Sequence, residues 1–152
     1  MGFKVRFEID KDAEEEEIII RCKSLNEEIL RIENLINSTG INEIELHLNG
    51  KDFFIPLTEI LFFEAAEAKT AAHTKDRMYY TDLKLYELEE KLPRSFMRIS
   101  KSCILNLNSV SSLRRELTGI CEANFPDTAK KVYISRSYYK PFREKITEIR
   151  KV

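Results

Sequence analysis

A lysine between two serines is the residue group in this chain that is best suited to bind a ligand. Ser100, Lys101 and Ser102 separate two apolar runs with the pattern of core strands. A cation flanked by two hydroxyls, with no acidic residue close by in the sequence, is poorly explained by packing. Its charge and its hydrogen-bond donors suit a phosphate oxygen or the edge of a base.

Arg136 is a second candidate, because it lies between a strand pattern at residues 132–134 and a helical pattern near Tyr138. A guanidinium held at such a junction can reach a groove and hold guanine O6 and N7 together. Its alternative role is a salt bridge to an acid such as Glu144. Lys101 likewise has an alternative role as an ordinary exposed loop lysine.

The residues around both candidates resemble one protein family. Residues 96–106 read Phe-Met-Arg-Ile-Ser-Lys-Ser-Cys-Ile-Leu-Asn, and residues 132–139 read Val-Tyr-Ile-Ser-Arg-Ser-Tyr-Tyr. These segments resemble the central motif and the closing Ser-Arg-x-Tyr motif of LytTR-type DNA-binding domains, which occur in bacterial transcription regulators. Residues 60–64 and 79–92 fit the early strands and the short helix of that family.

The resemblance implies DNA contacts from a first hairpin turn, from the central motif and from the closing motif. Carried over residue by residue, the DNA-binding candidates are Lys69, Arg98, Ser100, Lys101, Ser102, Ser135, Arg136, Ser137 and Tyr138. Many family members carry histidine where this chain has Ser100, so their base preference does not transfer. Asn106 is expected to be structural and to fix the turn after the central strand.

The resemblance also implies a mainly β fold, α+β overall, made of small β-sheets in an elongated arrangement with short helices. The loops of such a domain enter successive major grooves without a recognition helix, commonly on repeated sites. Hydrophobic periodicity predicts strands at residues 44–48, 53–55, 60–64, 70–74, 78–81, 110–113, 117–125 and 131–134. Asn49-Gly50 is typical of a tight hairpin turn, and Arg114-Arg115 is expected at another turn.

Two helices are predicted in this second part of the chain. Leu85, Leu88 and Leu92 mark a short amphipathic helix that Pro93 closes. The second predicted helix lies at the C-terminal end. Because Pro141 is tolerated only near the first turn of a helix, we expect this helix to start close to Tyr138 or Tyr139.

Residues 1–45 are predicted to form an acidic β-β-α extension ahead of the DNA-binding domain at 46–152. Strand patterns run from Phe3 to Ile9 and from Ile18 to Cys22. The helix is expected to start with the capping-box spacing Ser24-x-x-Glu27, to stop near Gly40, and to have an apolar face of Leu25, Ile29, Ile32 and Ile36. A unit this small has little core, so we expect it to dock on the rest of the chain or on a second subunit.

Charge is divided unevenly along the chain. The totals are 25 Lys+Arg and 26 Asp+Glu, but residues 1–45 hold 6 and 12 of these, and residues 93–152 hold 13 and 5. A basic C-terminal half has the sign and the placement of an electrostatic DNA footprint. The acidic run at residues 14–17 is either a solvated turn or a surface for a basic partner.

Other classes of protein find little support. The chain has no Gly-rich phosphate loop, no His-Glu-x-x-His motif and no nucleophile beside a base, so we predict no enzymatic activity, cofactor or metal. His73 is expected to be an ordinary strand histidine. Cys22, Cys103 and Cys121 are predicted to be buried free thiols in a reducing cytoplasm, and no signal peptide or membrane span is visible.

The sequence therefore predicts a sequence-specific, double-stranded DNA-binding transcription regulator, cytoplasmic and homodimeric. About 45 residues cannot house the phosphoacceptor receiver domain that often precedes this family's domain, so phosphorylation is not the expected switch. A regulatory protein partner is left open. The alternative is a protein-interaction module whose basic face binds an acidic partner, and an RNA binder is a third class. A steep dependence of duplex binding on salt distinguishes the DNA-binding regulator from the protein-interaction module.

Overall fold

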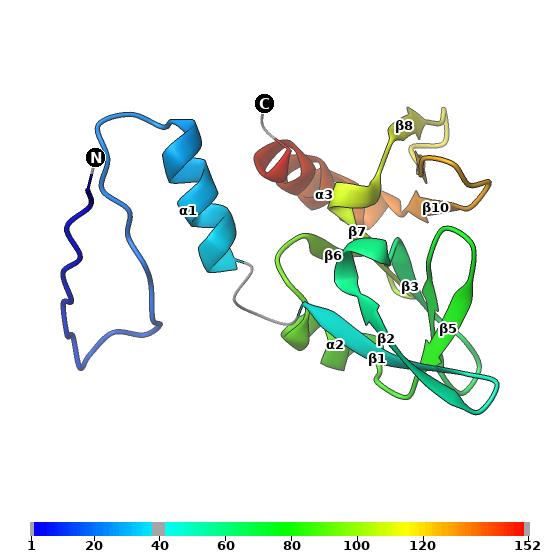
Figure 1. Cartoon of the computed structure of the whole chain (residues 1–152). Helices are drawn as coiled ribbons and strands as arrows, with labels where there is room; N and C mark the ends of the chain where they lie inside the picture. Colours follow the sequence, from blue (N-terminus) through cyan, green and yellow to red (C-terminus); the bar gives the residue numbers. More distant parts are fainter. Residues whose placement is uncertain (1, 38–41, 151–152) are drawn as a thin grey trace.

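Two antiparallel β-sheets of unequal size organise the chain in this computed structural model, which describes residues 2–37 and 42–150 (Figure 1). The helices are α1 (Glu27–Asn37), α2 (Leu85–Lys91) and α3 (Arg136–Ile149), with short 3-10 turns η1 (Leu57–Glu59) and η2 (Leu107–Ser109). The strands are β1 (Glu43–Leu48), β2 (Lys51–Pro56), β3 (Phe62–Ala65), β4 (Thr70–His73), β5 (Met78–Thr81), β6 (Phe96–Ser100), β7 (Cys103–Asn106), β8 (Ser112–Arg115), β9 (Cys121–Asn124) and β10 (Lys131–Ile134).

The larger sheet has seven strands in the order β2-β1-β5-β4-β3-β7-β6, so β2 and β6 are its two edges. The smaller sheet has three strands in the order β10-β9-β8. Asn49 and Gly50 have φ values of 53° and 77°, which are the positive angles of a tight hairpin turn. The predicted mainly β fold with short helices is confirmed.

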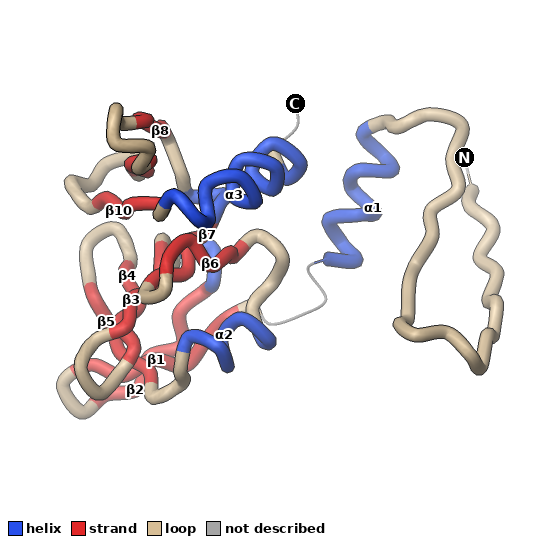
Figure 2. Tube along the Cα trace, turned by 180° about the vertical axis from the view of Figure 1, so that it is seen from behind, coloured by secondary structure: helices blue, strands red, loops and turns tan. Residues whose placement is uncertain are grey.

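Each face of the larger sheet packs on a separate hydrophobic core, because neighbouring side chains on a strand point to opposite faces. Phe63 and Ile104 pack with α2 on one face. Phe62 and Leu105 pack on the other face, against the smaller sheet and α3. Figure 2 shows α2 and α3 at different sides of the strands. This layering holds the ends of β6, β10 and α3 at fixed positions.

An aromatic stack joins the two sheets. The Phe62 ring lies between those of His73 and Phe125, with centroid separations of 4.2 Å and 5.7 Å. Beside it, Nζ of Lys130 donates hydrogen bonds to the carbonyl oxygens of Thr74 and Arg77, each at 2.8 Å. The loop between β9 and β10 is thereby fastened to the turn between β4 and β5.

The extension differs from the prediction. Among its described residues only α1 is formed, and neither Phe3–Ile9 nor Ile18–Cys22 becomes a strand. An alternating pattern favours a strand, but it requires a neighbouring strand to accept its hydrogen bonds. Helix α1 is capped by Asn26, whose Oδ1 accepts from the Ile29 amide at 3.0 Å, and not by Ser24. The expected stop at Gly40 lies outside the described residues.

The predicted burial of the extension holds only in part. Ile29 is buried and Ile32 and Ile36 are half-buried, but Leu25 on the same predicted face is exposed. Cys22 is also exposed, unlike the buried Cys103 and Cys121. The side chains that we expected inside a compact unit therefore lie largely at its surface.

Three local predictions in the DNA-binding half also need correction. Helix α3 begins at Arg136 and not at Tyr138, which places Pro141 inside the helix. Arg114 and Arg115 belong to strand β8, and the turn comes after them. Residues 117–120 form part of that turn instead of a strand, with Gly119 at φ 88°. Glycine adopts a positive φ at little steric cost, whereas a strand requires a negative φ, which explains why the strand pattern is interrupted there.

Asn106 has the structural role predicted for it. Its Nδ2 donates to the Ile60 carbonyl at 2.9 Å, and its Oδ1 accepts from the Asn108 amide at 3.1 Å. The residue is buried, so these bonds satisfy groups that water does not reach. In the described residues, no helix is both long and apolar enough to cross a membrane.

We predict that His73 makes folding stability dependent on pH. Burial, followed by the charge of Lys130, lowers the pKa of His73, although Glu64 at 3.2 Å opposes this. The unfolded chain binds this proton near its ordinary pKa, about 6.5, and the folded chain binds it less readily. Stability should therefore be full above about pH 6.5 and fall as the pH drops below it.

Urea unfolding at several pH values tests this prediction with His73→Gln. The variant should lose less unfolding free energy than the parent between about pH 7.5 and about pH 5.5. His47→Gln is the control, because His47 lies near the rim of the larger sheet beside Asp52. Equal pH dependence in the parent and in His73→Gln would contradict the assignment.

Candidate nucleic-acid interface

Three segments with polar side chains are held together at one end of the sheets. They are the β3–β4 turn (66–69), the β6–β7 turn (101–102) and the junction between β10 and α3. The Ala65 amide donates to the Ser102 carbonyl at 2.8 Å, which ties the first turn to the second. The Ser135 amide donates to the Ile99 carbonyl at 3.0 Å, which ties the third segment to β6.

The β6–β7 turn is braced from beneath by Arg98. Its Nε donates to the Ser100 carbonyl at 2.9 Å, and its Nη2 donates to the Lys101 carbonyl. Its Nη1 pairs with Glu89 of α2. The side chain of Arg98 is thus occupied within the protein, whereas that of Lys101 is exposed.

The serines on either side of Lys101 complete this turn. Ser100 Oγ accepts a hydrogen bond from the Ser102 amide at 3.2 Å. A β-bulge between Arg98 and Ser100 shifts the register of β6 against β7. Bulges re-aim side chains at sheet edges, and β6 is an edge strand. The tight turn that follows presents Lys101 at its tip.

Lys69 lies in the β3–β4 turn, where the sequence placed it. The turn is closed by the Ala66 amide, which donates to the Lys69 carbonyl at 2.9 Å. The Lys69 side chain is exposed. Because Ala65 bonds to Ser102, Lys69 and Lys101 come from adjacent turns of one sheet.

Arg136 is the first residue of α3 and is exposed. Its aliphatic stem lies over Gly119, because a Cβ atom built on that glycine would be 3.1 Å from Arg136 Cδ. Ser135 precedes the helix, with its Oγ 3.3 Å from that of Ser137. Ser137 is exposed, while Tyr138 is half-buried against the core. The free amides of a helix start favour an anion there.

Two residues at this end of the molecule were not predicted from the sequence. Gly119 leaves room for the stem of Arg136, and Arg115 lies over the Tyr139 ring, 4.6 Å from its centroid. The Thr118-Gly119 pair inside an apolar run is a turn signal, and it could have identified Gly119. Arg115 was expected to be a soluble turn residue, and no local pattern connects it to Tyr139.

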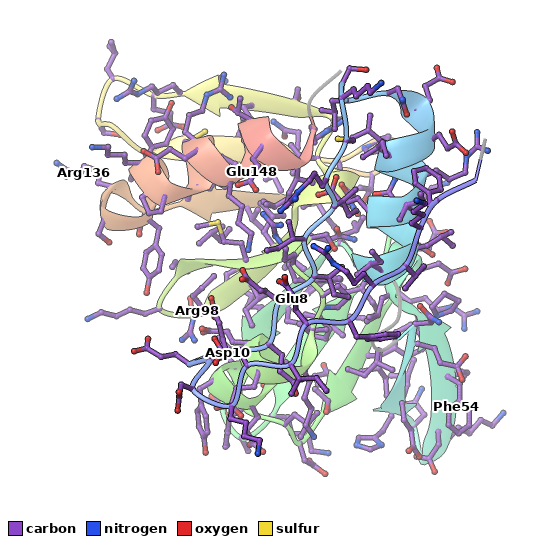
Figure 3. The ribbon with its side chains drawn as sticks, turned by 90° about the vertical axis from the view of Figure 1, so that its left-hand side faces the viewer. Glu8, Asp10, Phe54, Arg98, Arg136 and Glu148 are labelled. Carbon is purple, nitrogen blue, oxygen red and sulfur yellow. The ribbon has the colours of Figure 1, made fainter. Side chains whose placement is uncertain are left out.

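The exposed cations of this surface form no ion pairs within the described part of the chain. Among the described residues, neither Lys69, Lys101 nor Arg136 forms an ion pair, and the considered bridge from Arg136 to Glu144 is not made. At the opposite end of β6 and α3, Arg94 is paired with Glu148. Figure 3 shows Arg98 and Arg136 toward one side of the molecule, with Glu148 farther along α3 and Phe54 across the view.

The chemistry of this surface is binding. It offers mobile ammonium groups, one guanidinium, hydroxyls and a helix start, all anchored on rigid turns. The part of the chain that the structure describes has no group of three His, Cys, Asp or Glu residues that could hold a metal. Separate loops that carry exposed cations suit an extended polyanion.

Comparison with known proteins identifies the family. The model of the LytTr DNA-binding domain matches residues 50–147, and the chain belongs to this family. A solved LytTr DNA-binding domain from Bacillus cereus has the same fold, with a TM-score of 0.66, 23% identity, and coverage of 70% of this chain and 98% of that one. The chain therefore carries a DNA-binding domain.

Relatives in Staphylococcus aureus extend the similarity beyond that domain. In strains bovine RF122 / ET3-1 and NCTC 8325 / PS 47, two proteins named as uncharacterized HTH-type transcriptional regulators are each 28% identical to this chain. The alignments cover 95% of this chain and 98% of each relative, so they include most of the extension. HTH denotes helix-turn-helix, but in the described residues of this chain strands always separate one helix from the next.

We predict that Arg98 acts by positioning the β6–β7 turn. Arg98→Lys keeps the charge but cannot hold two carbonyls and Glu89 in one planar fork. Backbone amides at residues 100–103 should exchange faster with deuterium, and the unfolding free energy should fall by about 1–2 kcal/mol. Arg94→Lys, at the other end of β6, is the control. Unchanged exchange at residues 100–103 would remove this role.

Proposed function

We propose that this protein is a transcription regulator that reads specific double-stranded DNA through loops in the major groove. The proposal rests on a set of exposed cations that form no ion pair with any described residue. They lie on three rigid segments, which backbone hydrogen bonds from Ala65 and Ser135 tie together. Rigid placement matters, because a base contact has to recur at one position of every bound site. No enzymatic step is part of this function.

Some of these side chains read bases, and others position the protein by binding phosphates. Arg136 reads a base, since its planar fork matches guanine O6 and N7. Ser135 and Ser137, at the start of α3, hold a neighbouring phosphate with the helix amides. Tyr138, half-buried behind them, supports that phosphate contact through its hydroxyl.

The two exposed lysines extend the footprint along the duplex. Lys101 contacts a phosphate or a base edge from its turn, with Ser100 and Ser102 beside it. Lys69 reaches the DNA from the adjacent turn. Arg98 serves the interface indirectly, because it holds the carbonyls of the turn that presents Lys101.

The unit that binds DNA corresponds to residues 46–152, and residues 1–45 form a separate extension. The protein acts in the cytoplasm of a bacterial cell, where it has access to the chromosome. A homodimer on repeated sites suits a single small domain, because two copies on one duplex multiply their separate affinities. A regulatory protein partner is compatible with this arrangement.

We predict that Arg136→Lys keeps non-specific binding but loses sequence discrimination. Lysine retains the attraction to phosphate but not the bidentate geometry, so discrimination should fall by about 1–3 kcal/mol at one or two base pairs. Selection of bound sequences from a random duplex pool measures this. Arg77→Lys, an exposed arginine in the β4–β5 turn, is the control that should select the parent site.

The same selection can reject the reading role. If Arg136→Lys selects the parent sequence with equal stringency, Arg136 contacts phosphate or stabilises the fold. The base-reading role would then pass to Lys69 or Lys101.

We predict that Lys101→Ala weakens DNA binding without unfolding the domain, because the side chain is exposed and has no core contact. If it neutralises a phosphate, affinity falls for all sequences and the slope of log K against log salt decreases by about 0.9. If it reads a base, the loss concentrates at one position. Lys51→Ala, on the far edge strand β2, is the matched control.

Fluorescence anisotropy at several salt concentrations distinguishes these results. Unchanged affinity of Lys101→Ala for the selected site would exclude Lys101 from the interface. A parent chain that shows no steep salt dependence on any duplex, but binds an acidic protein, would favour the interaction-module alternative.

A further inference from the structure

The extension exposes a strand-like segment that has no neighbouring strand among residues 2–37 and 42–150. From Phe3 to Ile9 apolar residues alternate with charged ones, yet among residues 2–22 no strand is formed. Val5, Phe7 and Ile9 are 82%, 88% and 90% exposed. Apolar groups at such exposure gain free energy when another surface covers them.

The charged residues of this segment form a pattern that complements itself. Reading along the chain, Lys4 and Arg6 are positive, and Glu8 and Asp10 are negative. Two copies paired antiparallel with Phe7 on the two-fold axis bring Arg6 opposite Glu8, and Lys4 opposite Asp10. Opposite charges directly across an antiparallel pair stabilise it.

The apolar residues match in the same register. Phe7 faces Phe7 of the second copy, and Val5 faces Ile9. Residues directly opposite in an antiparallel pair point to the same face, so all of these apolar side chains lie on one side of the ribbon. A segment that matches both its charges and its apolar residues in one register specifies that register strongly.

Pairing within the chain fits less well. The other strand-like segment of the extension is Ile18–Cys22. A hairpin that sets Ile9 opposite Ile18 also sets Arg6 opposite Arg21, and Lys4 opposite Lys23. Like charges directly across a strand pair are destabilising. In the structure Arg6 instead lies 3.7 Å from Glu8 of its own segment, at the exposed surface.

We propose that residues 4–10 form an interface with a second copy of this chain, as a two-fold antiparallel strand pair centred on Phe7. A two-stranded ribbon alone is marginal in water, so its apolar face needs cover. Ile18, Ile19 and Leu30 are exposed apolar residues of the same extension and supply that cover from both copies. The interface is isologous, so it closes at a dimer. It is independent of the DNA-binding surface.

Sedimentation of the full chain over a range of concentrations gives the first test. The parent should be a dimer, and Phe7→Glu should be a monomer with the same unfolding midpoint. Phe54→Glu is the matched control, because Phe54 is 63% exposed but lies on strand β2 outside the extension. A monomeric parent at all concentrations, or a Phe7→Glu variant that still dimerises, overturns the proposal.

Charge reversal gives a second test that separates this interface from contacts within one chain. Arg6→Glu alone sets glutamates opposite each other twice, and Glu8→Arg alone sets arginines opposite each other twice. Each variant should self-associate about tenfold more weakly or worse. Mixed together they restore both opposite-charge pairs, so a heterodimer should form. If the mixture associates no better than either variant alone, the register is wrong.

Disulfide trapping fixes the register directly. In a Cys22→Ser background, Phe7→Cys places two thiols opposite each other at a Cα separation of about 4.5–5.5 Å, which a disulfide spans. Val5→Cys places its thiols about 13 Å apart, so it should not cross-link. Reversal of this outcome contradicts the pairing.

Phe7→Glu should still bind a single DNA half-site, so failure of the dimer and failure of DNA binding are distinguishable.

Discussion

The hydrogen bond from the Ser135 amide to the Ile99 carbonyl is the contact on which the proposed interface depends. Strand β6 is an edge of the larger sheet, so its outward-facing backbone groups have no further strand to pair with. The Ile99 carbonyl is one of these groups, and it accepts the hydrogen bond from the Ser135 amide at the junction between β10 and α3. The smaller sheet and α3 are also linked to the larger sheet by the Lys130 hydrogen bonds and by the Arg94–Glu148 ion pair. The Ser135 bond is the one that lies beside Arg136 and sets its position relative to the strand that leads to Lys101.

The same principle explains why the surface is built from turns. Backbone hydrogen bonds fix the ends of the strands, and a short turn adds little freedom beyond them. Arg98 adds a side-chain brace to the β6–β7 turn, and this use makes it unavailable to DNA. Lys69, Lys101 and Arg136 are available to DNA, because their side chains form no ion pair with any described residue.

Much of the fold follows from local patterns in the sequence. The Asn49-Gly50 hairpin, the strands around Ser100–Ser102 and the cap at Asn106 are each determined by neighbours within a few residues. The start of α3 was misplaced because the proline rule considers only the helix, whereas the Ser135 amide is fixed by a distant strand. The inward orientation of Arg98 depends on Glu89 of α2, and the cover over Gly119 depends on Arg136. Such contacts join distant segments and leave no periodic signal.

The extension shows the opposite case, in which the pattern is clear but no partner strand is formed among the described residues. Alternation from Phe3 to Ile9 predicts a strand correctly only if a second strand is available, and sequence periodicity does not say where that strand lies. The self-complementary order of Lys4, Arg6, Glu8 and Asp10 supplies this information. It assigns to residues 4–10 a role that the DNA-binding domain alone does not require.

We propose that three rigid segments form one continuous DNA-binding surface. Titration of the isotope-labelled chain with its selected duplex, monitored by backbone amide chemical shifts, is a direct test of this surface. The largest changes should fall together at residues 66–69, 100–102 and 135–138, while strand β2 at the far edge of the sheet should be unaffected. Changes centred on β2 or α2, with residues 100–102 and 135–138 unmoved, would contradict it.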